Sequence, residues 1–159
     1  MATLPQLLVE DIQRLDDELR ELLDRSDATT ALIIDNGGFL ITSAGDSRRF
    51  DLTTIAALAS GAYLANQTIA NLVHETNFNS VYQQGEKFSM FVLRVDEETM
   101  LVVIFKADVS VGVVKYFATP AAQQIASQLQ FAHQRDPEGG LDLSVLNIAD
   151  TSEVFKKKG

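Results

Sequence analysis

Two runs of uninterrupted apolar residues limit what this chain can fold into. Ala31 to Ile34 and Met100 to Phe105 contain no polar residue, whereas a strand with one face in water alternates apolar and polar side chains. A strand that is apolar on both sides must be covered on both faces. The two runs therefore predict central strands of a sheet between helices, which is a three-layer domain.

The remaining strands are expected where turn-forming residues separate apolar segments. Asp35-Asn36-Gly37-Gly38 lies between two such segments, and an Asn-Gly pair readily adopts the positive φ values that a two-residue hairpin turn requires. Gln84-Gly85-Glu86 and Asp96-Glu97-Glu98 are further turn candidates. They divide this part of the chain into three expected strands, at residues 78–83, 88–95 and 100–106.

The first helix has a one-sided apolar pattern. Its apolar residues alternate in steps of four and three and are Leu8, Ile12, Leu15, Leu19 and Leu22. Charged residues occupy most positions between them, which is typical of an amphipathic helix. Pro5 suits the first turn of this helix, because the amide hydrogen that proline lacks has no partner there.

Two further helices are expected. Asp51 is a favourable N-cap residue, and the segment from it to about Glu75 contains no proline and many alanines. The last helix is expected from Val111 to about His133. Pro120 either starts the main part of that helix or kinks it.

These elements predict an α+β domain in the order helix, two strands, helix, three strands, helix. Short hairpins on both sides of the middle helix favour an antiparallel sheet with helices on both faces. A length of 159 residues without a linker rich in Pro, Gly and Ser indicates one domain. We assign residues 1–134 to this domain and expect residues 135–159 to form a flexible, polar C-terminal tail.

Composition narrows the range of functions. The formal net charge is -9, and an acidic surface repels nucleic-acid phosphates, so we expect protein or small-molecule partners instead. The chain has no cysteine, which excludes disulfides and fits a reducing compartment. No basic start of a signal peptide is present, and polar residues interrupt the one long uncharged segment. We therefore expect a cytoplasmic protein without a membrane span.

Chemical motifs are sparse. The glycine-rich stretch GGFLITSAG has no phosphate-binding lysine, and His74 and His133 lie far apart without a Cys, Asp or Glu cluster at metal-ligand spacing. We therefore expect no catalytic site, no metal, no cofactor and no enzyme activity. Arg48-Arg49 suits either an arginine finger for a partner's nucleotide or a solvated loop. Lys156-Lys157-Lys158 either contacts an acidic partner or stays solvated.

The middle helix has no charged residue between Leu52 and Val73. On helical spacing, one face is expected to pack on the sheet and contains Leu58, Ala62, Ala65, Ile69 and Leu72. The other side carries small or neutral groups, which are Ala57, Ser60, Leu64, Gln67, Thr68 and Asn71. Protein interfaces are depleted in charge at their centre, so this second side is expected to bind another protein. The alternative is a helix buried on all sides within one large core.

The strand that follows this helix favours a symmetric dimer. Residues 78–83 are short and polar, as in an edge strand that is open to pairing with its own copy. An uncharged helix beside such an edge would extend the same interface.

The chain resembles the roadblock (dynein light chain) superfamily. The likeness covers about Asp11 to Gln134 and is carried by IIDNGGFLITSAG, LTTIAALASGAYLANQTIANL, QQGE and MLVVIF. Within the superfamily, the long neutral helix followed by Gln84-Gly85-Glu86 is most similar to the bacterial MglB group. The resemblance implies a five-stranded antiparallel sheet with the middle helix on one face and the terminal helices on the other.

The resemblance also implies a function. MglB-like homodimers bind a small Ras-like GTPase of the MglA type and accelerate its GTP hydrolysis by repositioning its switch regions, without an arginine finger, in cell polarity or motility. The implied GTPase-binding residues are Ser60, Leu64, Gln67, Thr68 and Asn71. The implied dimer-interface residues are Ala57, Phe78, Asn79, Ser80, Val81, Tyr82 and Gln83. A roadblock scaffold that anchors other proteins without affecting hydrolysis is the rival hypothesis, and a small-molecule sensor is a third.

Overall fold

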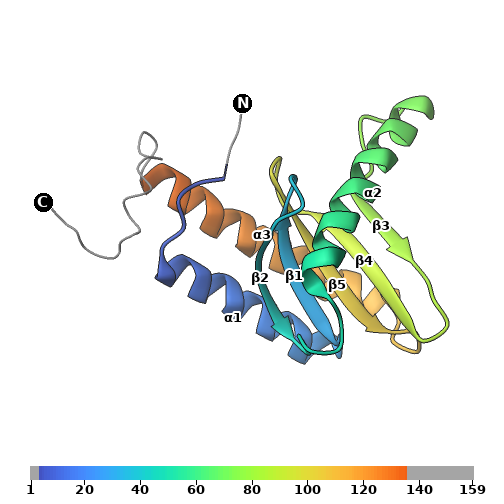
Figure 1. Ribbon diagram of the computed structural model, residues 1–159, viewed down its shortest axis with the longest axis horizontal. Coiled ribbons are helices and arrows are strands. Elements are labelled where there is room, and N and C mark those ends of the chain that lie inside the picture. The colour runs from blue at the N-terminus through green and yellow to red at the C-terminus, as the bar shows by residue number, and fades with distance from the viewer. Residues whose placement is uncertain (1–3, 136–159) are drawn as a thin grey trace, which may run out of the picture.

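The computed structural model describes residues 4–135, which form three helices around one sheet (Figure 1). In chain order, the elements are α1 (Val9–Ser26), β1 (Thr30–Asp35), β2 (Leu40–Gly45), α2 (Leu52–Leu72), β3 (Ser80–Gln83), β4 (Phe88–Arg94), β5 (Thr99–Lys106) and α3 (Val111–Arg135). This is the order expected from the sequence. The tail expected over residues 135–159 lies outside the described residues, apart from Arg135 at the end of α3.

The five strands form one antiparallel sheet in the order β2-β1-β5-β4-β3. The two continuously apolar runs belong to β1 and β5, which pair with each other inside the sheet, with Leu32 opposite Val102. Their central position is confirmed. A strand that is apolar on both sides is stable only where both faces are covered.

The sheet has a helical layer on each face. Helices α1 and α3 cover one face and α2 covers the other (Figure 1). Along β1, alternation sends Ala31 and Ile33 towards α1 and α3, and Leu32 and Ile34 towards α2. The three-layer arrangement, including the helix expected on each face, is therefore confirmed.

The turn between β1 and β2 differs from the two-residue turn that we expected. The positive φ belongs to Gly38, at 88°, and Asn36 does not adopt one. The Gly38 amide donates to the Asp35 carbonyl at 2.9 Å, and the β1–β2 register shifts beside the turn, as in a bulged hairpin. Asn36 instead joins two turns, because its side-chain amide donates to the Glu97 carbonyl at 2.6 Å.

Helix α1 is tied to the end of α3. Pro5 precedes α1, so the expectation that it lies in the first turn is wrong. Asp11 stabilises that turn instead, and its carboxylate accepts the Leu8 amide at 2.8 Å. Gln128 and Arg135 of α3 also donate to Asp11. The two helices are therefore antiparallel, with the end of α3 beside the start of α1.

Helix α3 continues through Pro120, so this residue does not mark the start of the helix. Proline has no amide hydrogen and removes one hydrogen bond of the helical ladder. The hydroxyl of the preceding Thr119 donates to the Lys115 carbonyl at 2.9 Å in the same turn.

Candidate protein interaction site

Helix α2 places an uncharged surface on one face of the sheet. Asp51 caps its first turn, because the carboxylate accepts the Thr54 hydroxyl at 2.7 Å and the Thr54 amide at 3.2 Å. The same two hydrogen bonds hold the pKa of Asp51 below its usual value. Figure 1 shows the last turns of α2 extending beyond the strands. Within residues 4–135, no helix, α2 included, is long and apolar enough to cross a membrane.

The side of α2 that packs on the sheet is not the one that we expected. Its buried residues are Leu52, Ala56, Ala59, Ser60, Tyr63 and Ala70. The five residues expected on the sheet are exposed, and we call them the apolar face of α2: Leu58, Ala62, Ala65, Ile69 and Leu72. Because no side of this helix is charged, hydrophobic periodicity does not distinguish the sheet-facing side from the outer one. Small alanines let the backbone of α2 lie close to the sheet.

Tyr63 fixes the middle of α2 to the neighbouring strands. Its hydroxyl donates to the Phe78 carbonyl at 2.8 Å, and Arg94 Nε donates to the same hydroxyl oxygen at 3.0 Å. The Arg94 guanidinium also lies 5.1 Å from the centroid of the Tyr63 ring. These contacts position the connection between α2 and β3, since Phe78 lies just before β3.

Two of the expected GTPase-binding residues do not present their side chains outward. Ser60 is 4% exposed, and its hydroxyl donates to the Asn36 carbonyl at 2.6 Å. The expectation that Ser60 lies on an exposed side is therefore wrong, because this hydroxyl holds α2 to the β1–β2 turn. Gln67 is half-buried, and its amide nitrogen is buried without a hydrogen-bond partner among residues 4–135. The other three expected residues are exposed: Leu64, Thr68 and Asn71.

The outer side of α2 exposes large aliphatic side chains. Leu58 is 69% exposed, Ile69 is 49% and Leu72 is 74%, and all three belong to the apolar face. Leu64, beside that face, is 55% exposed. Isolated exposed aliphatic residues are ordinary, but a row of them on a helix without charge marks an interaction surface.

Strand β3 is the outermost strand at its end of the sheet, and among residues 4–135 it pairs with β4 alone. The expected dimer residues from Phe78 to Gln83 lie in this strand or directly before it. Val81 packs on the α2 side, whereas Tyr82 stacks on Phe105 on the opposite face, with ring centroids 6.2 Å apart. The outer backbone edge of β3 is therefore open to pairing with another strand.

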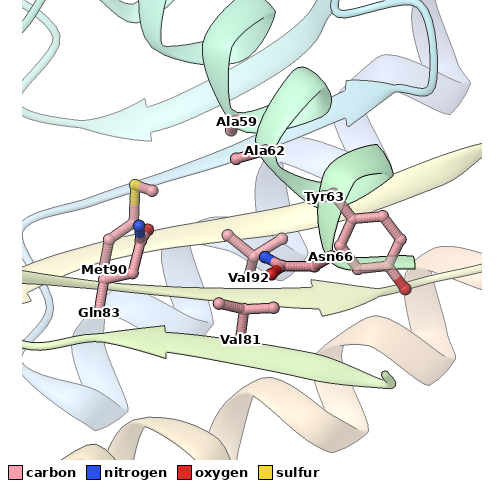
Figure 2. Close-up of a pocket in the computed structure, with 8 residues that line it drawn as sticks. All are labelled: Ala59, Ala62, Tyr63, Asn66, Val81, Gln83, Met90 and Val92. Atoms are coloured by element: carbon pink, nitrogen blue, oxygen red, sulfur yellow. The ribbon is translucent and has the colours of Figure 1, made fainter. Parts of the chain in front are cut away.

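A groove separates α2 from β3 and β4 (Figure 2). It is lined by Ala59, Ala62, Tyr63 and Asn66 of α2, by Val81 and Gln83 of β3, and by Met90 and Val92 of β4. Ala62 belongs both to this groove and to the apolar face, so the two are continuous. We call the apolar face, the groove and the edge of β3 together the α2–β3 surface. Asn66, Met90 and Val92 were not expected in the site, because only the packing of α2 over β4 brings them together.

Ala57 lies apart from the α2–β3 surface. A Cβ atom built on Gly38 would be 3.0 Å from the Ala57 Cα, so Ala57 lies over the β1–β2 turn. Helical spacing places it on a different side of α2 from Ala62 in the groove. The structure therefore does not bring Ala57 together with the other expected dimer residues in β3.

The loop before α2 carries two arginines, Arg48 and Arg49. Arg49 Nε lies 3.2 Å from Asp46 Oδ2, and the guanidinium is 5.6 Å from the centroid of the Phe88 ring. Arg48 is exposed in the same loop. In the part of the chain that the structure describes, no group of three or more His, Cys, Asp or Glu residues could hold a metal ion.

The three-layer fold carries one uncharged helix beside an open sheet edge, and together these form a candidate protein-interaction surface. A family model of the Roadblock/LC7 domain matches residues 14–105, and the chain belongs to this family.

Solved structures place the chain close to MglB proteins. A structure of MglB with a tetrameric arrangement is 27% identical, with a TM-score of 0.76, over 83% of this chain and 98% of that one. The gliding protein MglB from Thermus thermophilus is also 27% identical, with a TM-score of 0.75 over 82% of this chain and 98% of that one. Myxococcus xanthus MglB is also 27% identical, with a TM-score of 0.71 over 74% of this chain and 96% of that one. The comparison with curated protein sequences gave no match. The chain is thus a roadblock domain with an MglB-like structure.

Proposed function

We propose that this chain is a homodimeric regulator of a small Ras-like GTPase of the MglA type and that it accelerates GTP hydrolysis. The observation that carries the proposal is the uncharged α2–β3 surface, with Leu58 and Leu72 mostly exposed, in a domain whose structural neighbours are MglB proteins. A cytoplasmic location and a role in cell polarity or motility belong to the same proposal.

Two different surfaces bind the two partners. The edge of β3, the adjoining groove and the apolar face of α2 face a second copy of the chain, so that two sheets join edge to edge and two α2 helices pair. Leu64 and Thr68, with Asn71, lie on a separate exposed strip of α2 and contact the GTPase. We do not assign Ser60 or Gln67 to the GTPase contact. The Ser60 hydroxyl donates to the Asn36 carbonyl inside the fold, and the side-chain amide nitrogen of Gln67 is buried.

In this proposal the chain supplies position and no catalytic group, so it is not itself an enzyme. GTP hydrolysis depends on oriented groups that stabilise negative charge on the transferred phosphoryl group and position the attacking water. Switch loops held against a pair of α2 helices would bring the GTPase's own residues into place. We propose a mechanism without an arginine finger, and the two exposed arginines in the loop before α2, Arg48 and Arg49, are the residues that test it.

The first test measures GTP hydrolysis by an MglA-type GTPase with increasing amounts of this chain. We expect acceleration that saturates near one dimer per GTPase. Complex formation without acceleration would instead make the chain a scaffold. Absence of a complex would overturn the proposal.

Two substitutions on α2 locate the GTPase contact. Leu64→Arg and Thr68→Arg should each abolish GTPase binding, because a long charged side chain would be buried without a partner. Both residues are exposed, so each variant should remain a folded dimer. Gln13→Arg on the exposed side of α1 is the matched control and should bind normally. Normal binding by both α2 variants would move the GTPase to another surface.

The absence of an arginine finger is tested at Arg48 and Arg49. Arg48→Ala and Arg49→Ala should each retain the acceleration, with GTPase binding measured in parallel. Loss of acceleration with intact binding in either variant would identify that residue as a finger.

A further inference from the structure

A pocket lies on the α1 and α3 side of the sheet, away from the α2–β3 surface. It is lined by Leu4 and Pro5 of the N-terminal segment, by Asp96, Glu97, Glu98 and Thr99 of the β4–β5 turn, and by Ala126, Leu129, Gln130 and His133 of α3. Three segments that are distant in sequence therefore meet around it. None of its residues belongs to the surface proposed for the GTPase or the second copy.

The pocket combines an apolar lining with an acidic rim. Leu4, Pro5, Ala126 and Leu129 supply the apolar side chains. The rim is the consecutive triplet from Asp96 to Glu98, and the ion pairs formed among residues 4–135 use other acids, which are Asp11, Glu21 and Asp46. The C-terminal end of α3 adds the negative end of a helix dipole. A cationic segment that also carries apolar side chains fits this chemistry.

Thr99, which lines the same pocket, carries an unpaired hydroxyl. It is fully buried, and its hydroxyl oxygen has no hydrogen-bond partner among residues 4–135. Side chains alternate along β5, and Leu101, two residues on, packs with α1 and α3. Thr99 therefore faces the same layer as the pocket that it lines. Buried polar groups in native proteins are normally paired, so this hydroxyl marks a part of the pocket whose polar groups residues 4–135 do not fully satisfy.

The chain carries a matching segment beyond the described residues. Val154 and Phe155 are followed by Lys156-Lys157-Lys158, the longest run of basic residues in the sequence. The described part ends at Arg135, two residues after His133 of the pocket, and Asp11 holds that end in place. An extended chain spans about 3.3 Å per residue, so the intervening residues can easily return to the pocket.

We propose that the chain's own segment Val154 to Lys158 docks in this pocket, with its apolar pair on the lining and its lysines on the acidic rim. Tethering gives the segment a high effective concentration, so weak contacts suffice. Docking there keeps the C-terminal segment on the layer of α1 and α3, away from the α2–β3 surface. This docking requires no GTPase.

Paramagnetic broadening in NMR spectra of the full chain tests the docking. The sequence has no cysteine, so a nitroxide attached to Gly159→Cys labels one position only. We expect the amide peaks of Glu97, Glu98 and Gln130 to lose most of their intensity, and added salt should restore them. Uniform broadening, or broadening centred on α2 or β3, would overturn the proposal.

Charge reversals test the proposed contacts. Lys156→Glu, Lys157→Glu and Lys158→Glu together should abolish the broadening, as should Glu97→Lys with Glu98→Lys. Combining both sets should restore it. The control is Asp17→Lys with Asp24→Lys, on exposed positions of α1. It changes the net charge by the same amount as the two substitutions on the rim and should leave the broadening intact. Failure of the combined variant to restore it, or loss in the α1 control, would contradict docking at the rim.

A mixed sample separates docking within one chain from docking on a second copy. Isotope-labelled chains without nitroxide are mixed with unlabelled chains that carry it, and the subunits are allowed to exchange. We expect the pocket amides to keep their intensity. Broadening of these amides in the mixed sample would place the segment in another copy's pocket and overturn the proposal.

Discussion

At the scale of single residues, Asp11 joins two helices through a buried charge. It is fully buried, and its carboxylate accepts hydrogen bonds from the Leu8 amide, Gln128 and Arg135. Burial by itself raises the pKa of Asp11, but the hydrogen bonds and the charge of Arg135 outweigh it. The pKa therefore lies below its usual value of 3.8. A carboxylate whose pKa is lowered by folding stabilises the fold while it is ionised.

We expect Asp11→Asn to lower the free energy of unfolding by about 2 kcal/mol at neutral pH, because an amide replaces the charged acceptor. The difference in free energy of unfolding between the wild-type protein and Asp11→Asn should be fully present above pH 3.8, the ordinary pKa of the carboxyl. It should disappear as the pH falls from there through the lowered pKa of the folded state, where the carboxylate becomes protonated. Urea unfolding at a series of pH values measures this, and a difference independent of pH would contradict it.

Gly45 is a second residue that the fold constrains closely, because its position has no room for a Cβ atom. Its φ is 96°, and a Cβ atom there would lie 2.3 Å from the Thr29 carbonyl oxygen. We expect Gly45→Ala to lower the free energy of unfolding by about 3 kcal/mol, measured by urea unfolding. Gly61→Ala is the control, because a Cβ atom there meets nothing within 4 Å, and helix propensity should make it neutral or slightly stabilising. Equal losses in the two variants would contradict the steric explanation.

At the scale of elements, α2 has two uncharged sides with different environments. The sheet-facing side is built mainly from small residues around Tyr63, whereas the outer side exposes Leu58 and Leu72. A charge on the outer side is solvated in a single chain but would be buried in a dimer. The outer side can therefore be changed without disturbing the core.

We expect Leu58→Glu to weaken or abolish the dimer while leaving the single chain folded, because an unpaired charge at an interface costs several kcal/mol. Sedimentation measures the mass, and circular dichroism measures the fold. Thr53→Glu is the matched control, since it adds the same charge at an exposed position of α2 on another side of the helix. An intact Leu58→Glu dimer would remove this face from the interface.

At the scale of the whole molecule, the proposed dimer couples stability to concentration. A species that forms only from folded chains stabilises them by mass action. We expect the melting temperature of the wild-type chain to rise with protein concentration, and that of Leu58→Glu to remain constant. A wild-type melting temperature that is independent of concentration would indicate that the α2–β3 surface serves a different partner.

Most of the architecture followed from local patterns. The apolar runs in β1 and β5 fixed the central strands, because only a covered strand tolerates apolar residues on both sides. The breaks at Gln84-Gly85-Glu86 and at Asp96-Glu97-Glu98 separated the later strands near their observed bounds. The lack of charge in α2 also predicted an interaction surface on this helix, which its exposed leucines support.

The orientation of α2 and the details of its contacts were decided only by the tertiary structure. With no charge on any side, periodicity favoured the larger aliphatic residues for the core, yet the alanine-rich side packs on the sheet and Leu58 faces outward. Ser60 became buried because its hydroxyl meets the Asn36 carbonyl, and Gly38 took the positive φ expected at Asn36. The sequence by itself determined which segments are strands and helices, since these depend on neighbouring residues. The choice of packing side depends on partners distant along the chain, which no local pattern contains.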